Sequence, residues 1–171
     1  LLAVMAVCVM CGGNTGISDL SETLVNLGLA AIGPTLLLAT ASFVITLTAE
    51  NARIPFDNPD THLELTMVHE GMMLEYAGRG LALMELSSMM RLTIFLTMLG
   101  TVFLPWGIAT AAEPAALLIG TVTIMIKLLI FCFGLAVLES SLTKFRLFKT
   151  PNLLTASFVL ALLAIMSVYI L

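Results

Sequence analysis

The side chains that could carry protons are concentrated in one part of this 171-residue sequence. Seven of its 11 acidic residues and both histidines, His62 and His69, lie between positions 50 and 85. The acidic residues of this cluster are Glu50, Asp57, Asp60, Glu64, Glu70, Glu75 and Glu85. Partly desolvated carboxylates have raised pKa values, and groups that titrate near neutral pH can relay protons. The cluster therefore predicts a proton path, and an ordinary solvated acidic loop is the alternative.

The middle of this cluster has the pattern of a short helix. Pro55 and Pro59 favour turns, because a proline disfavours helix at the residue before it. A Thr-x-x-Glu capping box that ends at Glu64 then predicts a helix over 61–76. The helical period places Glu64 and Glu75 on one face of it, while apolar residues fill much of the remaining circumference. We expect this helix to pack at the membrane surface or against a partner protein.

Further ionisable residues lie within or beside an apolar run over 114–138. Lys127 is near the middle of the run, where a charge costs at least about 2.5 kcal/mol, so we expect it to face a polar cavity or a partner's acid. Glu139 follows at the end of the run. A plain interfacial ion pair is the alternative for Glu85 and Arg91. Three arginines lie close to the acidic cluster and would orient its carboxylates: Arg53, Arg79 and Arg91.

Composition indicates that the elements carrying these residues are membrane helices. The sequence is 60% apolar and 11% charged, whereas a soluble domain carries about 25% charged residues. This composition excludes a soluble enzyme, a secreted disulfide scaffold and a nucleic-acid-binding protein. Cys8 and Cys11 have no second cysteine pair with which to complete a metal site, so we expect no metal to be bound by this chain.

Uncharged runs predict the membrane spans, because a bilayer core takes about 20 apolar residues to cross. Four runs are long enough to be complete spans: 28–49, 92–112, 114–138 with its single lysine, and 150–171. The shorter run 1–11 is interpreted as a span that is cut short. Residues 1–171 would then form one membrane module, the C-terminal part of a longer subunit. The predicted fold is an all-α polytopic membrane protein with four complete spans, a truncated first span and a long acidic loop.

Basic residues predict how the chain is oriented in the membrane. Lys and Arg occur in the predicted loops 50–91 and 139–149 and are absent from the predicted loop 12–27 and the short link 107–114. The positive-inside rule therefore places the loops 50–91 and 139–149 in the cytoplasm and the C-terminus on the opposite side.

Specific motifs point to a known family. The segment 50–60 (ENARIPFDNPD) resembles the E-x-N-R-x-P-F-D-x-P-E signature of the respiratory complex I membrane protein known as subunit 1. Glu64-Leu65 and the segment 75–78 (EYAG) are similar to two further motifs of this family. Lys127 matches a lysine of the family's penultimate helix, and 142–146 (LTKFR) resembles its L-P-R-Y-R ending. The resemblance extends over roughly residues 28–165.

Departures from that pattern indicate one branch of the family. The stretch between Glu64 and Glu75 is longer than in the quinone-reducing subunits, His62 stands in place of a glutamate, and Glu139 stands in place of an arginine. The segment 62–70 (HLELTMVHE) is instead similar to the branch in energy-converting [NiFe]-hydrogenases and formate hydrogenlyase, closest to the hydrogenase-4 type.

The resemblance implies a non-catalytic subunit of an oxidoreductase complex in a bacterial or archaeal cytoplasmic membrane. The chain would bind no redox cofactor, and neighbouring subunits would carry [4Fe-4S] clusters and a nickel–iron centre. The loop 50–85 would dock hydrophilic hydrogenase and iron–sulfur subunits on the cytoplasmic face, with antiporter-like subunits beside it in the bilayer. The acidic cluster, Lys127 and Glu139 would link electron transfer to proton or sodium translocation. The alternatives are a quinone-chamber subunit of NADH:quinone oxidoreductase and a purely structural membrane anchor.

Overall fold

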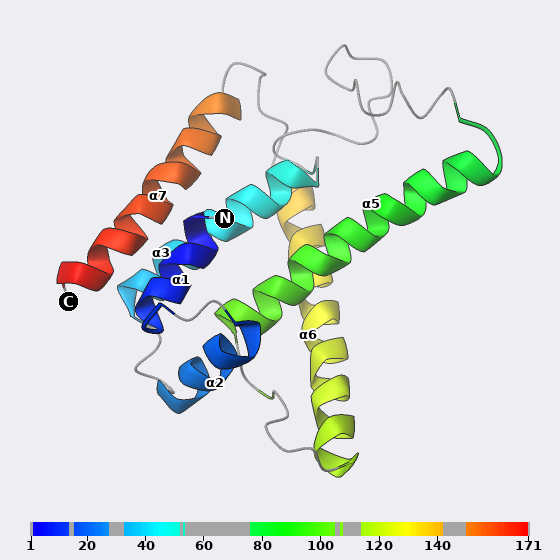
Figure 1. Cartoon of the computed structure of the whole chain (residues 1–171). Helices are drawn as coiled ribbons and strands as arrows, with labels where there is room; N and C mark the ends of the chain where they lie inside the picture. The colour runs from blue at the N-terminus through cyan, green and yellow to red at the C-terminus, as the bar shows by residue number, and fades with distance from the viewer. Residues whose placement is uncertain are drawn as a thin grey trace.

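The computed structural model is helical over the residues that it describes, which are 2–13, 16–27, 33–51, 53, 76–104, 107, 114–141 and 150–170. The helices, shown in Figure 1, are α1 (Leu2–Met10), α2 (Ile17–Leu27), α3 (Pro34–Glu50), α5 (Arg79–Met98), α6 (Pro114–Ser141) and α7 (Thr150–Ile170). A π-helical turn, η2 (Leu99–Phe103), continues α5 without a break. The predicted helical fold class is confirmed for this part of the chain.

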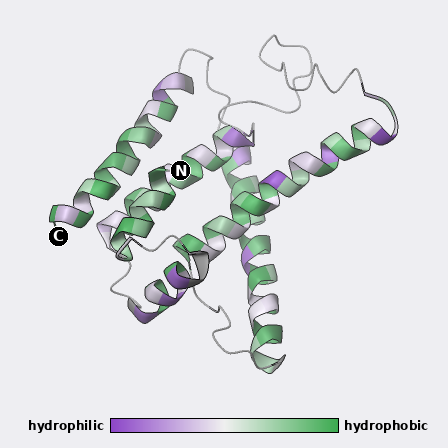
Figure 2. Cartoon of the chain, viewed as in Figure 1, coloured by the Kyte–Doolittle hydropathy of each residue, from purple (hydrophilic) through white to green (hydrophobic). Residues whose placement is uncertain are grey.

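Three of the helical segments are long and apolar enough to cross a membrane: Arg79–Phe103, Ala115–Ser141 and Pro151–Ile170. The helix α3 is apolar as well, but it has only 17 residues. Figure 2 shows hydrophobic residues along most of α6 and α7, as expected for helices in contact with lipid. The chain is a multi-pass integral membrane protein. The prediction of four complete spans stays a prediction, because 28–32 lie outside the described residues.

The helix α5 begins well before the predicted span 92–112, at Arg79. It starts directly after Gly78, whose φ of +57° suits a glycine. Glu85 and Arg91 lie inside α5, because glutamate and arginine are good helix formers. An uncharged run indicates the part of a helix that contacts lipid, and the helix itself can begin earlier, as α5 does. The predicted end of the acidic loop at residue 91 is therefore wrong, since its last part belongs to α5.

The segment 12–27, predicted to be a loop, contains the amphipathic helix α2. Two glycines with positive φ end α1 and lead into this segment. Leu20 and Leu24, one turn apart, are buried, whereas Glu22 is exposed. The helix α2 packs on η2, so it lies against the C-terminal end of α5.

The described helices form two groups, visible in Figure 1. The helices α1, α3 and α7 pack side by side, and α5 with η2 packs on α6. Phe43 of α3 joins the groups, because its ring centroid lies 4.9 Å from that of Phe103 and 6.0 Å from that of Phe95. Tilted aromatic pairs at such separations are favourable. The end of α5 is therefore held by α2, α3 and α6 together.

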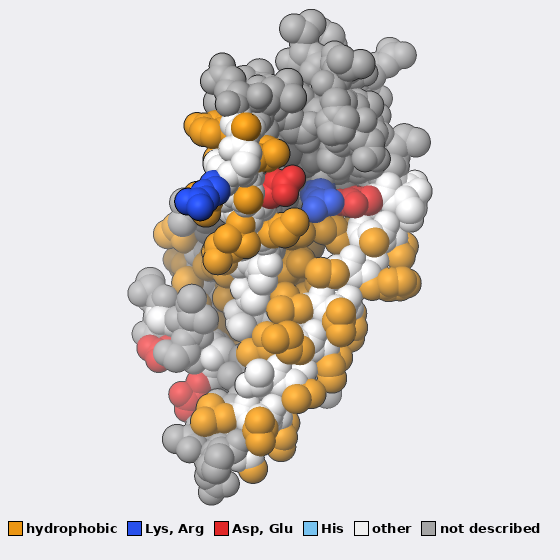
Figure 3. All heavy atoms as spheres, turned by 90° about the vertical axis from the view of Figure 1, so that its right-hand side faces the viewer, with side chains coloured by type: hydrophobic (Ala, Val, Ile, Leu, Met, Phe, Trp, Pro, Cys, Tyr) orange, Lys and Arg blue, Asp and Glu red, His pale blue; other side chains and the backbone are white. Residues whose placement is uncertain are grey.

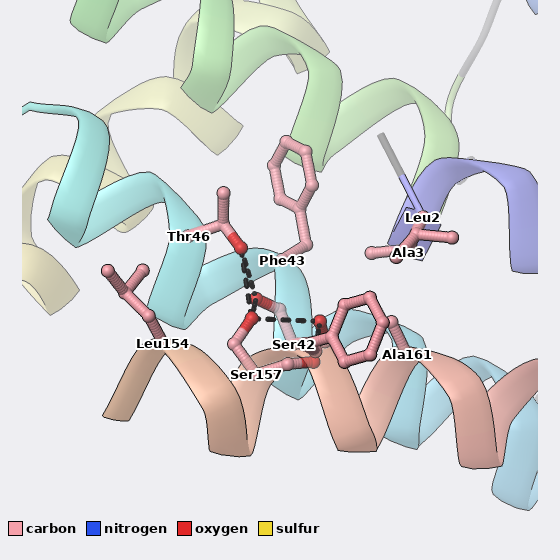
Figure 4. A pocket seen from close by; sticks show the side chains of 9 residues that line it. Leu2, Ala3, Ser42, Phe43, Thr46, Leu154, Ser157 and Ala161 are labelled. Atoms are coloured by element: carbon pink, nitrogen blue, oxygen red, sulfur yellow. Dashed lines mark hydrogen bonds between the residues drawn. The ribbon is translucent and has the colours of Figure 1, made fainter. Parts of the chain in front are cut away.

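Hydroxyl groups join α3 to α7, as Figure 4 shows. Ser42 Oγ donates to the carbonyl oxygen of Ser157 (2.7 Å), and Ser157 Oγ donates to that of Ser42 (3.0 Å). The hydroxyl oxygens of Thr46 and Ser157 lie 3.0 Å apart, and those of Thr35 and Ser167 lie 2.7 Å apart. Small hydroxyl residues let membrane helices approach closely and bond across their interface. A cavity of about 230 Å³ adjoins this cluster and is also lined by α1.

Candidate functional site

The described residues include seven of the twelve that the sequence predicts for the site. Five acidic residues of the cluster lie outside the described residues: Asp57, Asp60, Glu64, Glu70 and Glu75. The predicted helix 61–76 and both histidines lie outside them as well. The other seven are distributed over three helices and the residues that follow α3: Glu50, Arg53, Arg79, Glu85, Arg91, Lys127 and Glu139. Among these seven, the structure pairs one arginine with one glutamate.

That pair is Arg53 with Glu139, and a hydrogen-bonded turn at the end of α3 positions it. The backbone N–H and the Nδ2 of Asn51 both donate to Leu47 O, at 3.2 and 2.9 Å. The Arg53 N–H donates to Thr48 O at 2.9 Å. Arg53 Nη1 then lies 3.4 Å from Oε1 of Glu139, in the last turn of α6, with 36% and 24% of the two side chains exposed. The ion pair thus joins the C-terminal ends of α3 and α6, and each of these ends precedes one of the two predicted cytoplasmic loops. Two loops on the same side of the membrane require these helix ends to lie close together.

Charged side chains mark two opposite ends of the described helices. Figure 3 shows the face that lies on the right-hand side of Figure 1. Acidic and basic side chains form a band across its upper part, and hydrophobic side chains cover the helices below the band. The helix α2 carries Asp19 and Glu22, and it lies at the other end of α3 from Glu50 (Figure 1). This distribution gives an apolar zone between two polar ends, as a membrane-spanning protein needs.

Lys127 lies half-buried on α6 beside the end of α5. Its Nζ donates to the carbonyl oxygens of Gly100 (3.2 Å) and Leu104 (2.5 Å). A cavity of about 10 Å³ adjoins the lysine, which is close to the smallest volume that holds one water molecule. Among the described residues, the structure records no acidic partner for Lys127. Backbone carbonyl groups therefore compensate its charge here, and an acid on a partner protein stays a prediction.

The other charged residues of the predicted site lie on the N-terminal half of α5. Arg79, Glu85 and Arg91 are all exposed. Residues that face one another on a helix are three or four positions apart, whereas Glu85 and Arg91 are separated by six. The structure records no ion pair between these two residues, and the role of each stays a prediction. Leu83 and Met89, on the same half of α5, are also largely exposed.

The described part of the chain contains no group of three or more histidine, cysteine or acidic residues that could hold a metal ion. Cys8 and Cys11 are free thiols at the C-terminal end of α1, and Cys132 is a free, exposed thiol on α6. No residue in this part of the chain is therefore assigned to a metal or cluster.

Sequence reasoning missed the partners of Lys127, although two signals for them are present. Gly100 removes side-chain bulk from α5 opposite a lysine. Pro105 directly follows Leu104, which disfavours helix at Leu104 and leaves terminal carbonyl groups in an apolar run. Together these signals favour a cation at the end of that helix.

Comparisons with known proteins agree with the membrane architecture. The sequence profile of a family described as NADH dehydrogenase matches residues 1–170. Formate hydrogenlyase subunit 4 of Escherichia coli (strain K12) is 30% identical over 167 residues, which are 98% of this chain and 53% of that protein. Hydrogenase-4 component C of the same organism is 28% identical over 164 residues, covering 96% of this chain and 50% of that protein. The chain thus spans about half the length of these relatives. No solved structure gives a significant match.

Proposed function

Because this chain belongs to the NADH dehydrogenase family of membrane subunits, we propose that it anchors a multi-subunit oxidoreductase and couples its electron transfer to proton or sodium translocation. The similarity to a formate hydrogenlyase subunit and a hydrogenase-4 component supports a membrane-bound [NiFe]-hydrogenase as the type of complex. In this proposal the acidic segment, residues 50–85, faces the cytoplasm of a bacterium or archaeon. It docks the hydrophilic subunits, which carry the redox centres.

The observation that carries the proposal is the position of two charged contacts on one helix. Glu139 at the end of α6 pairs with Arg53, where the acidic segment begins. Lys127 lies twelve positions earlier on the same helix, which corresponds to about 18 Å along its axis. These two residues extend the ionisable groups of the acidic segment into the apolar zone. A passive anchor needs no charge at the position of Lys127, where one is costly.

The proposed coupling is electrostatic. Glu50, Asp57, Asp60, Glu64, Glu70, Glu75 and Glu85 take up or release protons when a neighbouring redox centre changes its charge. Arg53, Arg79 and Arg91 orient these carboxylates. Lys127 and Glu139 respond to the changed charge and bias ion movement in adjoining subunits. Coupling between two such sites typically amounts to about 1–3 kcal/mol.

The exposed apolar surface of α6 supports partners within the membrane. Leu118, Leu129 and Phe133 are each about 70% exposed on this helix. A surface of this kind contacts lipid or another membrane subunit. We place antiporter-like subunits beside α6, since they would receive the charge changes at Lys127.

Purification of the tagged full-length protein in mild detergent tests which complex it belongs to. We expect nickel–iron and iron–sulfur subunits to accompany it, together with hydrogen-evolving activity. A flavin subunit with quinone reduction that is sensitive to quinone analogues would instead show a complex I subunit. A protein that purifies alone would contradict the proposal.

Neutral variants of the assembled complex test the coupling role. Glu64→Gln, Glu75→Gln and Lys127→Met are expected to lower ion transport in proteoliposomes by roughly 5- to 150-fold, as a coupling of about 1–3 kcal/mol implies. Electron transfer and assembly should be retained. Glu22→Gln, which removes an exposed acid of α2, is the matched control and should transport normally. Loss of assembly without loss of coupling in the complexes that do form would show a structural anchor.

A further inference from the structure

The C-terminal end of α5 lies among apolar residues, where its carbonyl groups need partners. Leu99, Val102 and Phe103 of η2 are buried. Leu104 has left the helix, with φ −131° and ψ 71°. Pro105 follows in the sequence and has no N–H to donate. The last carbonyl groups of a helix have no partner within it, and lipid offers none.

Lys127 supplies the missing donors from a neighbouring helix. Its Nζ bonds to Gly100 O at 3.2 Å and to Leu104 O at 2.5 Å, so it spans the whole of η2. A lysine at a helix C-terminus satisfies terminal carbonyl groups and complements the negative end of the helix dipole. The other residues that line the adjoining cavity, such as Thr97 and Thr101, carry no ionisable group. The carbonyl groups are therefore the recorded partners of the ammonium group among the described residues.

Gly100 lets α6 lie close to η2 beside this contact. A Cβ atom at position 100 would lie 3.2 Å from Cε2 of Phe131 and 3.7 Å from Cδ of Lys127. A separation near 3.2 Å is tighter than ordinary van der Waals contact, so the Phe131 ring would have to shift by a few tenths of an ångström, whereas the contact with Lys127 would be an ordinary one. The helix is wound as a π-helix at the same place. Isolated π-helical turns occur frequently at functional sites.

We infer that Lys127 is a positioning residue whose ammonium group holds the end of α5 in its π-helical form, where Gly100 lets α6 lie close. The inference rests on the proposed function and deepens it, since α5 begins within the acidic segment 50–85 and carries its last acid, Glu85. Whether Lys127 makes its two hydrogen bonds thereby sets the conformation of η2, at the C-terminal end of α5. When the two hydrogen bonds are broken, the terminal carbonyl groups lose their partner and η2 rewinds.

A single carbonyl signal can report on this contact. Leu104-Pro105 is the one Leu-Pro pair in the sequence. Labelling leucine with ¹³C at the carbonyl and proline with ¹⁵N in this protein alone, before the complex is reassembled, restricts solid-state NMR spectra to its Leu-Pro pairs, of which residues 1–171 contain only Leu104-Pro105. A spectrum of Leu104→Val identifies the signal.

The expected result is a graded shift of that signal. Lys127→Met should move it upfield, because the carbonyl group loses its cationic donor. Lys127→Gln, which keeps an amide donor, should recover part of the shift, and Gly100→Ala should move the signal less than Lys127→Met does, because its Cβ is tight only against Phe131. Ile126→Met places the same side chain at the next position of α6, which is about half-exposed, and should leave the signal unchanged. An unmoved signal in Lys127→Met, or equal movement in Ile126→Met, would overturn the inference.

Ion transport in the same variants separates this inference from the proposed function. A positioning role predicts that Lys127→Gln retains more coupled transport than Lys127→Met. Equal loss in both variants, with the Leu104 signal recovered in Lys127→Gln, would show that the charge acts directly. That outcome overturns the inference and leaves the proposed function standing. Normal transport in Lys127→Met with a shifted signal would contradict the coupling role assigned to Lys127.

Discussion

Replacing Arg53 and Glu139 by glutamine, singly and together, is expected to show a coupling free energy of about 0.5–1 kcal/mol between them. The gross attraction is larger, because unit charges 3.4 Å apart attract by about 5 kcal/mol at an effective dielectric constant of about 20. Most of this is cancelled by screening and lost side-chain freedom, since the side chains are 36% and 24% exposed. The structure also gives the pair one contact rather than two parallel bonds, which keeps the value low.

The assay is equilibrium unfolding of the purified full-length protein in micelles titrated with a denaturing detergent. The coupling is obtained from the four unfolding free energies of the wild type, Arg53→Gln, Glu139→Gln and the double variant. It should decrease as salt is added, because the pair is only half-buried. The charge-reversed double variant, with glutamate at 53 and arginine at 139, should recover most of the stability.

The matched control is a second cycle between Arg91→Gln and Glu139→Gln. Arg91 is exposed on α5 and is not paired with Glu139, so these changes should add within about 0.3–0.5 kcal/mol. An Arg53–Glu139 coupling within the same range, or one that does not respond to salt, would refute the pairing. Arg53 would then be available to the acidic segment rather than to α6.

Further predictions concern packing and topology. Ser157→Ala should cost about 1 kcal/mol of unfolding free energy, because bonds between membrane helices average about 0.6 kcal/mol; no loss would show that the hydroxyl cluster is dispensable. Leu24→Ala should cost about 2–5 kcal/mol by opening a cavity between α2 and η2, and a smaller loss would mean that α2 is loosely held. Gly100→Val should cost about 1–3 kcal/mol by overpacking, measured in the same titration. In a background without native cysteines, Glu22→Cys should react with an impermeant thiol reagent outside intact cells, and Glu139→Cys only after the membrane is opened; the reverse pattern would invert the predicted orientation.

The apolar helices were the most predictable part of the fold. The runs 114–138 and 150–171 match α6 and α7 closely, because lipid excludes charge along the length of a span. The start of α5 was not predicted, since its first turns carry charged residues that favour helix without favouring lipid. The helix α2 was missed although Ile17, Leu20, Leu24 and Leu27 follow a helical spacing, because uncharged runs indicate membrane spans and this helix carries Asp19 and Glu22.

The candidate site was predictable as a set of residues and not as a set of contacts. Motifs and charge clustering identified Arg53, Glu139 and Lys127. Arg53 and Glu139 are 86 positions apart, and their pairing depends on how α3 and α6 pack, which neither motif encodes. The partners of Lys127 are backbone oxygens, which Gly100 and the proline after Leu104 indicate only indirectly. A charged residue in an apolar run predicts a partner side chain of opposite charge. Here the carbonyl groups at the end of a helix are the partner instead.

The attachment of α6 suggests why its two charged contacts suit a coupling element. Only 6% of its membrane window is buried within this chain, against 28% for the segment formed by α5 and η2. Glu139 fixes its end to α3 through Arg53, and Lys127 fixes its middle to the end of α5. A helix held by extensive apolar burial does not move when a nearby group gains or loses a proton. A helix with few apolar contacts, here made by Leu128, Phe131 and Leu135, responds more readily, because a change of about 1–3 kcal/mol at either charged point is a larger share of what holds it. The contrast with α7, which is joined to α3 by neutral hydroxyl groups, identifies α6 as the element on which a change of charge in the acidic segment would act.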